Sequence, residues 1–322
     1  IVQAIALEHN LLVIDLRLAQ CDPTDLLGFP NINADGTKAS YVPMDTFAME
    51  GDALPTETRK DAEGNEYTHT YAGWLLFLDE FNGADRSVQK AAYKLVLDKM
   101  VGMRKLHRNV AIVCAGNLDT DDAIVEEMST ALQSRLIHFE VKTDTDSWLT
   151  WALAAGIDHR ILSFIRFKPG NLNTFNPDID DGQNTYACER TWGDFTHKIL
   201  ATGIDVTDHN LLPILCGTIG EGIAREFTSF LRIYDKLPTM SQILANPMGI
   251  EVPREPGTLY ALTGSLGHNA SAKNLDALFD FIDRIPMEFQ VVTMREIGRR
   301  HNALLEEPRV EKWIALNNTE LF

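Results

Sequence analysis

The chain has 322 residues, and its 46 acidic against 29 basic side chains give it a net charge of −17. That balance argues against general binding to phosphate backbones or anionic membranes, because both repel a negative surface. The 45% apolar and 23% charged residues are typical of a globular protein that is long enough for two or three packed units. The four cysteines lie far apart and no apolar run approaches the ~20 residues of a membrane span, so we expect reduced, buried thiols and a cytoplasmic location.

Within the first 71 residues, regular secondary structure is predicted for the beginning and mostly irregular structure for the rest. Apolar residues at helical spacing over positions 1 to 6, followed by the apolar run Leu11 to Leu16, indicate the second half of a βαβ unit. No capping residue precedes this helix, so we expect that sequence upstream of Ile1 is missing. Residues 22 to 71 then suggest a short turn near residue 25, a hairpin around Tyr41 to Met49, and a mobile polar stretch from Glu57 to His69.

Between residues 73 and 141 the predicted strands alternate with helices. Strands are expected at 73–78, 110–115 and 136–141, and helices across about 84–101 and 120–134. Such alternation predicts a parallel sheet and an α/β fold class. After residue 144 the apolar spacing becomes helical. The helices expected there include 188–200, 207–235, 272–283, 287–305 and 308–316, with a Pro-rich segment from Pro238 to Pro256.

Two adjacent carboxylates end the most apolar strand, Gly73 to Leu78. Asp79 and Glu80 are expected at the carboxyl end of a buried central strand, which is where open α/β sheets bind their ligands. One acid could hold a magnesium ion through its water, and the other could polarise an attacking water. An acidic turn after a buried strand is the plainer alternative.

Asn117 follows the next predicted strand, so its amide is expected at the same sheet edge, where it can donate and accept together. A simple Gly-Asn turn remains the alternative. Arg135 lies where a helix leads into a strand; it could stabilise a γ-phosphate in a neighbouring subunit, or merely complement a helix terminus. Arg190 begins a helix of the second unit and could clamp a nucleotide, or be an ordinary surface arginine.

In order and rough spacing these features resemble the AAA+ ATPases, and most closely their MoxR branch. The most specific segment looks like the Walker B segment of that branch, with its Asp-Glu-x-Asn run: Asp79-Glu80-Phe81-Asn82-Gly83-Ala84. Three others look like sensor 1, the arginine-finger segment and sensor 2: Ala115-Gly116-Asn117, Leu132-Gln133-Ser134-Arg135-Leu136 and Arg190-Thr191-Trp192. Asp25-Leu26-Leu27-Gly28 resembles the segment after the family's second strand, and the likeness covers roughly residues 1 to 240.

The resemblance implies an architecture and a set of roles. It predicts a parallel-sheet AAA+ core over residues 1–143, a helical lid over 144–240 and a C-terminal helical extension over 241–322. With ATP and Mg²⁺ as cofactors, Asp79 would orient the metal, Glu80 activate the water and Asn117 position it. Arg135 would act on the nucleotide of a neighbouring subunit, and Arg190 would couple the lid to the nucleotide state. It further implies a homo-oligomer, a ring of six subunits, that remodels a protein client, one candidate link being a von Willebrand factor A-type adaptor.

Two departures from the family pattern qualify this expectation. No Gly-x-x-x-x-Gly-Lys-Ser/Thr segment occurs, since Asp35-Gly36-Thr37-Lys38 lacks the leading glycine. The phosphate-cradling loop is therefore expected upstream of Ile1, unless it was lost, and ATPase activity is conditional on it. Gly83 replaces an arginine that is common in the family, which puts an interface role for that side chain in doubt.

Two other functions remain open on the sequence. A nucleotide-free scaffold would keep the fold without the phosphate loop. A DNA-directed AAA+ motor would use a basic patch, for which the candidate is Arg104-Lys105-Leu106-His107-Arg108. The acidic balance of the whole chain argues against nucleic acid as the partner.

Overall fold

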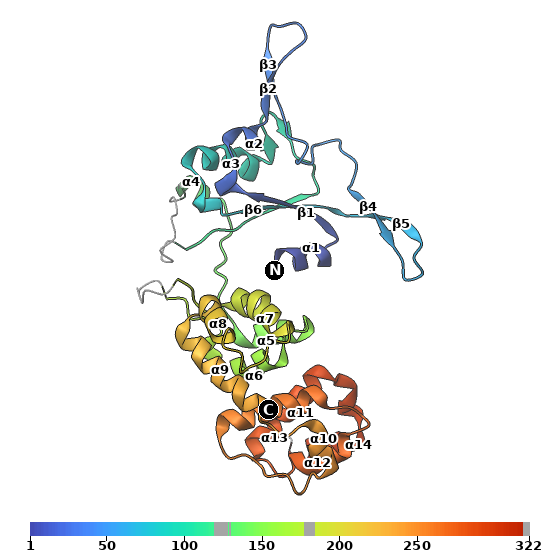
Figure 1. Cartoon of the computed structure of the whole chain (residues 1–322). Coiled ribbons are helices and arrows are strands. Elements are labelled where there is room, and N and C mark those ends of the chain that lie inside the picture. Colours follow the sequence, from blue (N-terminus) through green and yellow to red (C-terminus); the bar gives the residue numbers. More distant parts are fainter. Residues whose placement is uncertain (119–127, 129, 177–183, 318–322) are drawn as a thin grey trace. The chain divides into compact units, whose positions relative to one another are not determined.

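A three-stranded parallel sheet organises the N-terminal part of the protein in the computed structural model (Figure 1). The structure describes residues 1–118, 128, 130–176 and 184–317, and it divides the chain into two units, 1–139 and 140–322. Each unit has its own hydrophobic core and is described by itself. The protein is thus mixed α/β, as the alternation of predicted elements indicated. The finer division at residues 143 and 240 stays a prediction.

The sheet of unit 1 places the most apolar strand in its centre. Its order is β1–β6–β9, formed by Leu11–Arg17, Gly73–Asp79 and Val110–Cys114. Four side chains of β6 are at most 7% exposed, which confirms the prediction of a buried central strand: Trp74, Leu75, Leu76 and Leu78. Because all three strands run parallel, their carboxyl ends meet at one edge.

Helices α1 (Val2–Glu8), α2 (Pro23–Leu27) and α3 (Arg86–Asp98) complete the regular part of unit 1. Helix α3 follows from its pattern, since Val88, Ala92 and Leu95 recur at helical spacing and are buried in the same cluster as the β6 side chains. Helix α2 occupies the segment predicted as a turn. It begins with Pro23 and is closed at its start by a reciprocal capping box between Asp22 and Asp25.

Two antiparallel hairpins project from unit 1 (Figure 1). They pair β2 (Phe29–Ile32) with β3 (Ala39–Val42), and β4 (Thr56–Lys60) with β5 (Glu66–Thr70). The polar stretch 57–69, for which no regular structure was predicted, forms the second of these hairpins, and the hairpin expected at 41–49 was wrong. Residues 56–70 are polar because both faces of their ribbon are largely exposed, and alternating threonines still suit a strand. Asp61 closes the turn by accepting the backbone N–H groups of Glu63 and Asn65.

A third, shorter hairpin carries the basic patch. Strands β7 (Met100–Val101) and β8 (Arg104–Lys105) pair across Gly102, whose φ of 56° lies in the left-handed region. The arginines and lysine of the patch are exposed, whereas Leu106 is buried and His107 packs edge-on against Trp74.

The strand predicted at 136–141 does not form. Ile137, Phe139 and Val141 are 84%, 85% and 78% exposed, and the segment has no strand partner in the parts of the chain that the structure describes. Alternating apolar residues favour a half-buried strand, but a strand also needs a neighbour to satisfy its backbone groups. Of the helix predicted across 120–134, only α4 (Thr130–Gln133) can be assigned, because residues 119–127 and 129 lie outside the described residues.

Unit 2 is helical, as predicted. Its helices are α5 (Thr145–Ala154), α6 (His159–Phe167), a π-helical turn (Thr191–Thr196) leading into α7 (His197–Ala201), α8 (Leu211–Ile219), α9 (Glu221–Asp235), α10 (Met240–Ala245), α11 (Pro256–Asn269), α12 (Leu275–Ile282), α13 (Met287–Arg300) and α14 (Pro308–Leu316). The single helix expected over 207–235 is divided in two at Gly220, whose φ of 82° cannot continue a helix. None of the helices in the described ranges is long and apolar enough to cross a bilayer.

Helix α11 is the longest helix of unit 2 that the sequence does not predict, and the short α10 is likewise not predicted. Glycines, serine and threonines lower its intrinsic helix propensity, so the pattern did not indicate a helix. Packing stabilises it instead, because Leu259, Leu262 and Leu266 are at most 2% exposed. Its glycines allow close approach: a Cβ on Gly264 would lie 1.9 Å from Ser163 Oγ of α6, and one on Gly267 would lie 2.4 Å from the Cβ of a glutamate on α13.

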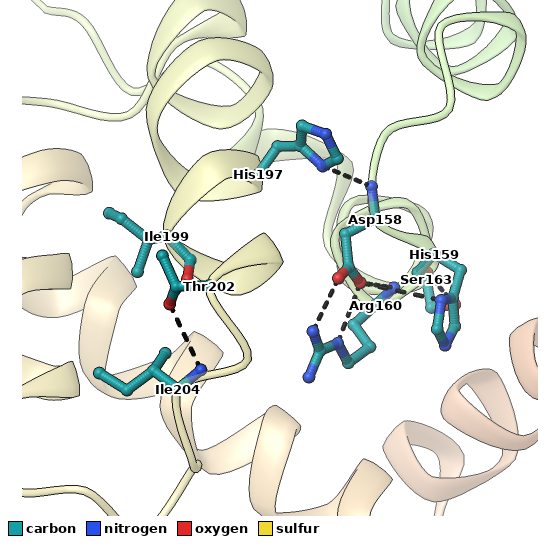
Figure 2. A network of polar contacts seen from close by, with 8 residues as sticks. All are labelled: Asp158, His159, Arg160, Ser163, His197, Ile199, Thr202 and Ile204. Atoms are coloured by element: carbon teal, nitrogen blue, oxygen red, sulfur yellow. Dashed lines mark hydrogen bonds and ion pairs between the residues drawn. The ribbon is translucent and has the colours of Figure 1, made fainter.

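A polar network fixes the start of α6 against α7 (Figure 2). Asp158 caps α6 by accepting the Arg160 N–H at 2.9 Å, and its carboxylate also accepts two bonds from the Arg160 guanidinium. The Asp158 N–H donates to Nδ1 of His197 at 3.1 Å. The Thr202 hydroxyl closes the other end of α7 by donating to the Ile199 carbonyl at 2.7 Å.

Candidate functional site

The carboxyl edge of the sheet brings together the segments that follow β6 and β9. Leu78 is paired with Cys114 at the last shared register position. Beyond it the Ala115 N–H donates to the Leu78 carbonyl at 2.9 Å, and the Phe81 N–H donates to the Ala115 carbonyl at 2.8 Å. The acidic pair and the Gly-Asn segment are therefore held side by side by backbone bonds, as the strand-end argument predicted.

Asn82 then joins the two segments through its side chain. Its Nδ2 donates to the Asn117 carbonyl at 2.7 Å, and its Oδ1 accepts the Asn117 N–H at 3.1 Å. The residue is only 7% exposed. Gly116 makes room for it, because a Cβ at that position would lie 2.2 Å from Asn82 Oδ1. Asn82 thus fixes the backbone of the residue predicted to position the attacking water.

Asn82 belongs to the Asp-Glu-x-Asn run, but the sequence alone predicts no role for it. One signal was available: an amide is the side chain that can donate to a carbonyl and accept from an N–H at once, which suits a clamp between two strand ends.

Asp79 and Glu80 differ in their surroundings. Asp79 is half-buried and its Oδ1 accepts the Glu80 N–H at 3.0 Å, which leaves Oδ2 without this bond. Glu80 is exposed and has a φ of 52°, in the left-handed region that ordinarily favours glycine. That conformation costs a side-chain-bearing residue about 1–2 kcal/mol. Asn10 and Lys99 adopt the same conformation where the chain turns, so at Glu80 it marks the sharp turn that follows β6.

Cys114 lies at the last position of β9, at the same edge. Burial raises the pKa of its thiol to about 11, so the group is uncharged near neutral pH. All four cysteines are free thiols of intermediate burial. The sequence predicts buried thiols, whereas all four are only half-buried.

Of the two arginines predicted to act on the nucleotide, Arg135 lies in unit 1 and Arg190 in unit 2. Arg135 follows α4, in unit 1, where its N–H donates to the carbonyl of the buried Leu132 at 3.0 Å and its side chain is exposed. Arg190 is exposed at the start of the helical segment that continues into the π-helical turn of unit 2. The structure thus brings together Asp79, Glu80 and Asn117, while the roles of both arginines stay predictions.

The carboxylates at this edge fit a metal ion that binds together with a phosphate-bearing substrate. Among the described residues no group of three or more histidine, cysteine, aspartate or glutamate side chains could hold a metal ion. Mg²⁺ is commonly bound by one or two carboxylates with waters and substrate phosphates. Asp79 and Glu80 suit that mode and do not suit a permanently bound ion.

Comparison with known proteins adds no family assignment. No protein-family model matches this chain, and no curated protein matches it. The likeness to AAA+ ATPases therefore rests on the motifs in the sequence.

Proposed function

We propose that the protein is an ATP-hydrolysing motor of the AAA+ type, similar to the MoxR branch, which remodels a protein client. The observation that carries the proposal is the clamp between Asn82 and Asn117. It joins the acidic strand end to the asparagine strand end, so that a metal-binding carboxylate, a water-activating carboxylate and an amide share one edge. Hydrolysis of a phosphoanhydride needs that combination.

The role of each residue comes from the resemblance, and the geometry of the site supports it. Asp79, half-buried with one oxygen engaged by the Glu80 N–H, would hold Mg²⁺ through water, and that ion would neutralise phosphate charge. Glu80 is exposed and would accept the proton of the attacking water. Asn117, with its backbone fixed by Asn82, would orient that water. Arg135 would reach the nucleotide of a neighbouring subunit, and Arg190 would link the second unit to nucleotide state.

The oligomer and the partners rest on the resemblance. A trans-acting Arg135 requires a ring, and we propose six copies, with a von Willebrand factor A-type protein as a candidate adaptor to the client. The basic hairpin at Arg104–Lys105 is short and exposed, and the chain has a net charge of −17, so a nucleic-acid client is not favoured.

Glu80→Gln tests the mechanism. The glutamine keeps the size of the side chain and removes its basicity, so ATP turnover should be abolished while ATP binding and assembly persist. Because activity is conditional on a phosphate loop, the protein should be expressed together with the codons upstream of Ile1. Turnover is measured by phosphate release, binding by calorimetry, and assembly by size-exclusion chromatography with light scattering. Glu63→Gln, in the exposed turn between β4 and β5, is the matched control. Unchanged turnover in Glu80→Gln would refute the assignment.

A nucleotide-free scaffold is the second candidate, favoured by the absence of Gly-x-x-x-x-Gly-Lys-Ser/Thr from these residues. The codons upstream of Ile1 separate the two candidates. A glycine-rich Lys-Ser or Lys-Thr segment within a few residues supports the enzyme, and its absence supports the scaffold.

A further inference from the structure

A cleft of about 470 Å³ opens in unit 2, far along the chain from the acidic pair. Helix α5 contributes Thr150 and Leu153 to its lining. The remaining part is rich in nitrogen, with His268 from α11 and three consecutive residues from the end of α13: Arg299, Arg300 and His301. None of the described residues that line it is acidic.

The charge behind this lining is unbalanced. Arg300 Nε lies 3.2 Å from Oε2 of Glu296, and Arg166 forms an ion pair with the same carboxylate. Glu296 is only 2% exposed, so two guanidinium groups share one buried carboxylate. Together with Arg299 they place three positive charges against one negative charge. Asp158, whose charge acts on the lining residue His268, is already matched by Arg160 at 2.7 Å. This local excess stands out in a chain of net charge −17.

Two nitrogen atoms at the cleft lack a hydrogen-bond partner. Arg300 is only 8% exposed, and its Nη2 has no partner in the described part of the chain. The same holds for Nε2 of His301. Buried polar groups in folded proteins are almost always hydrogen-bonded, and an unpaired buried charge-bearing donor is costly. Both residues line the cleft, but these two nitrogens are themselves buried, so each side chain must turn toward the cleft before an acceptor from outside can satisfy it.

We propose that this cleft binds a small organic oxyanion, either a phosphate monoester or a carboxylate. The planar guanidinium fork matches the oxygen spacing of both groups. The volume falls within the range of about 300–1,000 Å³ that small-molecule sites occupy. Leu153 and Ala154 on α5 offer apolar contact for the body of the ligand, whereas the Thr150 hydroxyl already donates to the Asp146 carbonyl at 2.9 Å.

His268 supplies a local readout of binding. Burial lowers the pKa of its ring, the neighbouring Arg300 and His301 lower it further, and the Asp158 carboxylate raises it in part. A bound anion opposes the positive charges, so the pKa of His268 rises on binding. Its ring signal can be assigned in an NMR spectrum by comparison with His268→Gln.

The test titrates the whole chain with phenyl phosphate and with benzoate, which share an aromatic body and differ in the anionic group. Calorimetry should show binding to one site per chain. Arg299→Gln and Arg300→Gln should each weaken it at least about tenfold, because each removes a charge-assisted hydrogen bond. Arg254→Gln removes the same charge from an exposed position outside the lining and should leave binding unchanged. Binding should also raise the pKa of His268.

Each outcome decides the proposal. Binding of phenyl phosphate alone identifies phosphate monoesters, and binding of both identifies oxyanions in general. The proposal is overturned if neither probe binds up to about 10 mM, which corresponds to a binding free energy weaker than about −3 kcal/mol. Equal affinity of Arg299→Gln and wild type for the probes also overturns it. Because Arg299 is exposed, this variant tests the proposal even if Arg300→Gln fails to fold. Capture of an acidic peptide where both probes fail would likewise replace it.

Discussion

Asn82 shows how a single buried amide can determine the geometry of a site. Its two hydrogen bonds hold both polar groups of the Asn117 backbone, while Gly116 between the partners leaves the space that Oδ1 occupies. Neither of the two side-chain hydrogen bonds to the Asn117 backbone comes from Asp79 or Glu80. The relative position of the two strand ends beyond their backbone bonds therefore depends on Asn82.

Asn82→Ala should lower both stability and turnover. Two buried hydrogen bonds are lost, which we expect to reduce the free energy of unfolding by about 1–3 kcal/mol. Displacement of Asn117 should reduce kcat about tenfold or more, because small misplacements of catalytic groups have large effects on rate. Chemical denaturation and phosphate release measure the two effects.

Asn109→Ala is the matched control for Asn82→Ala. Asn109 precedes β9 at the opposite edge of the sheet and donates from Nδ2 to the Ala72 carbonyl at 2.8 Å. Its replacement should lower stability and leave kcat unchanged. Equal loss of kcat in both variants would mean that the effect of Asn82 is one of general stability.

The strand-end rule found Asp79, Glu80 and Asn117 because it needs only the direction of two strands. It did not find Asn82, whose role depends on the distance between two turns. That distance is a tertiary property, and the pattern of apolar residues along one segment does not contain it.

The same contrast appears among elements. Strand β6 and helix α3 could be predicted because their apolar spacing matches the burial that they reach. Helix α11 could not, because its stability comes from neighbours on two sides. The segment 136–141 shows the converse, since it has the alternation of a strand and lacks a partner in the described structure.

Helix α11 gives a prediction at this scale. Gly267→Ala should destabilise unit 2 by about 1–3 kcal/mol net of the helix-propensity gain, because the new methyl would lie 2.4 Å from Glu296 Cβ, close to the backbone of α13. Gly217→Ala in α8 meets nothing within 4 Å and should instead stabilise by about 0.5–1 kcal/mol. Thermal unfolding followed by circular dichroism distinguishes the two signs. A stabilised Gly267→Ala variant would contradict the close packing of α11 on α13.

The whole molecule consists of two units with separate cores. Acid should lower the stability of unit 2 in particular, because that unit holds a stacked pair of histidines. In unit 2 the ring of His159 stacks on His268 at 4.3 Å and is 26% exposed. Burial lowers the pKa of His159 to about 4, and burial also lowers that of His268. Unfolded histidine binds a proton near pH 6.5, whereas folded His159 remains neutral down to about pH 4.

Between these two values the unfolded state binds more protons, so the free energy of unfolding of unit 2 should fall as the pH is lowered from 6.5 to 4. The difference for His159 alone corresponds to about 3 kcal/mol, fully present above pH 6.5 and lost by about pH 4. His159→Gln should remove most of this decline, whereas His209→Gln, at a side chain that is 92% exposed, should leave it. Denaturant unfolding at pH 7 and at pH 4.5 measures the difference. If His159→Gln and wild type lose equal stability over this range, the acid sensitivity of unit 2 arises outside the stacked histidine pair.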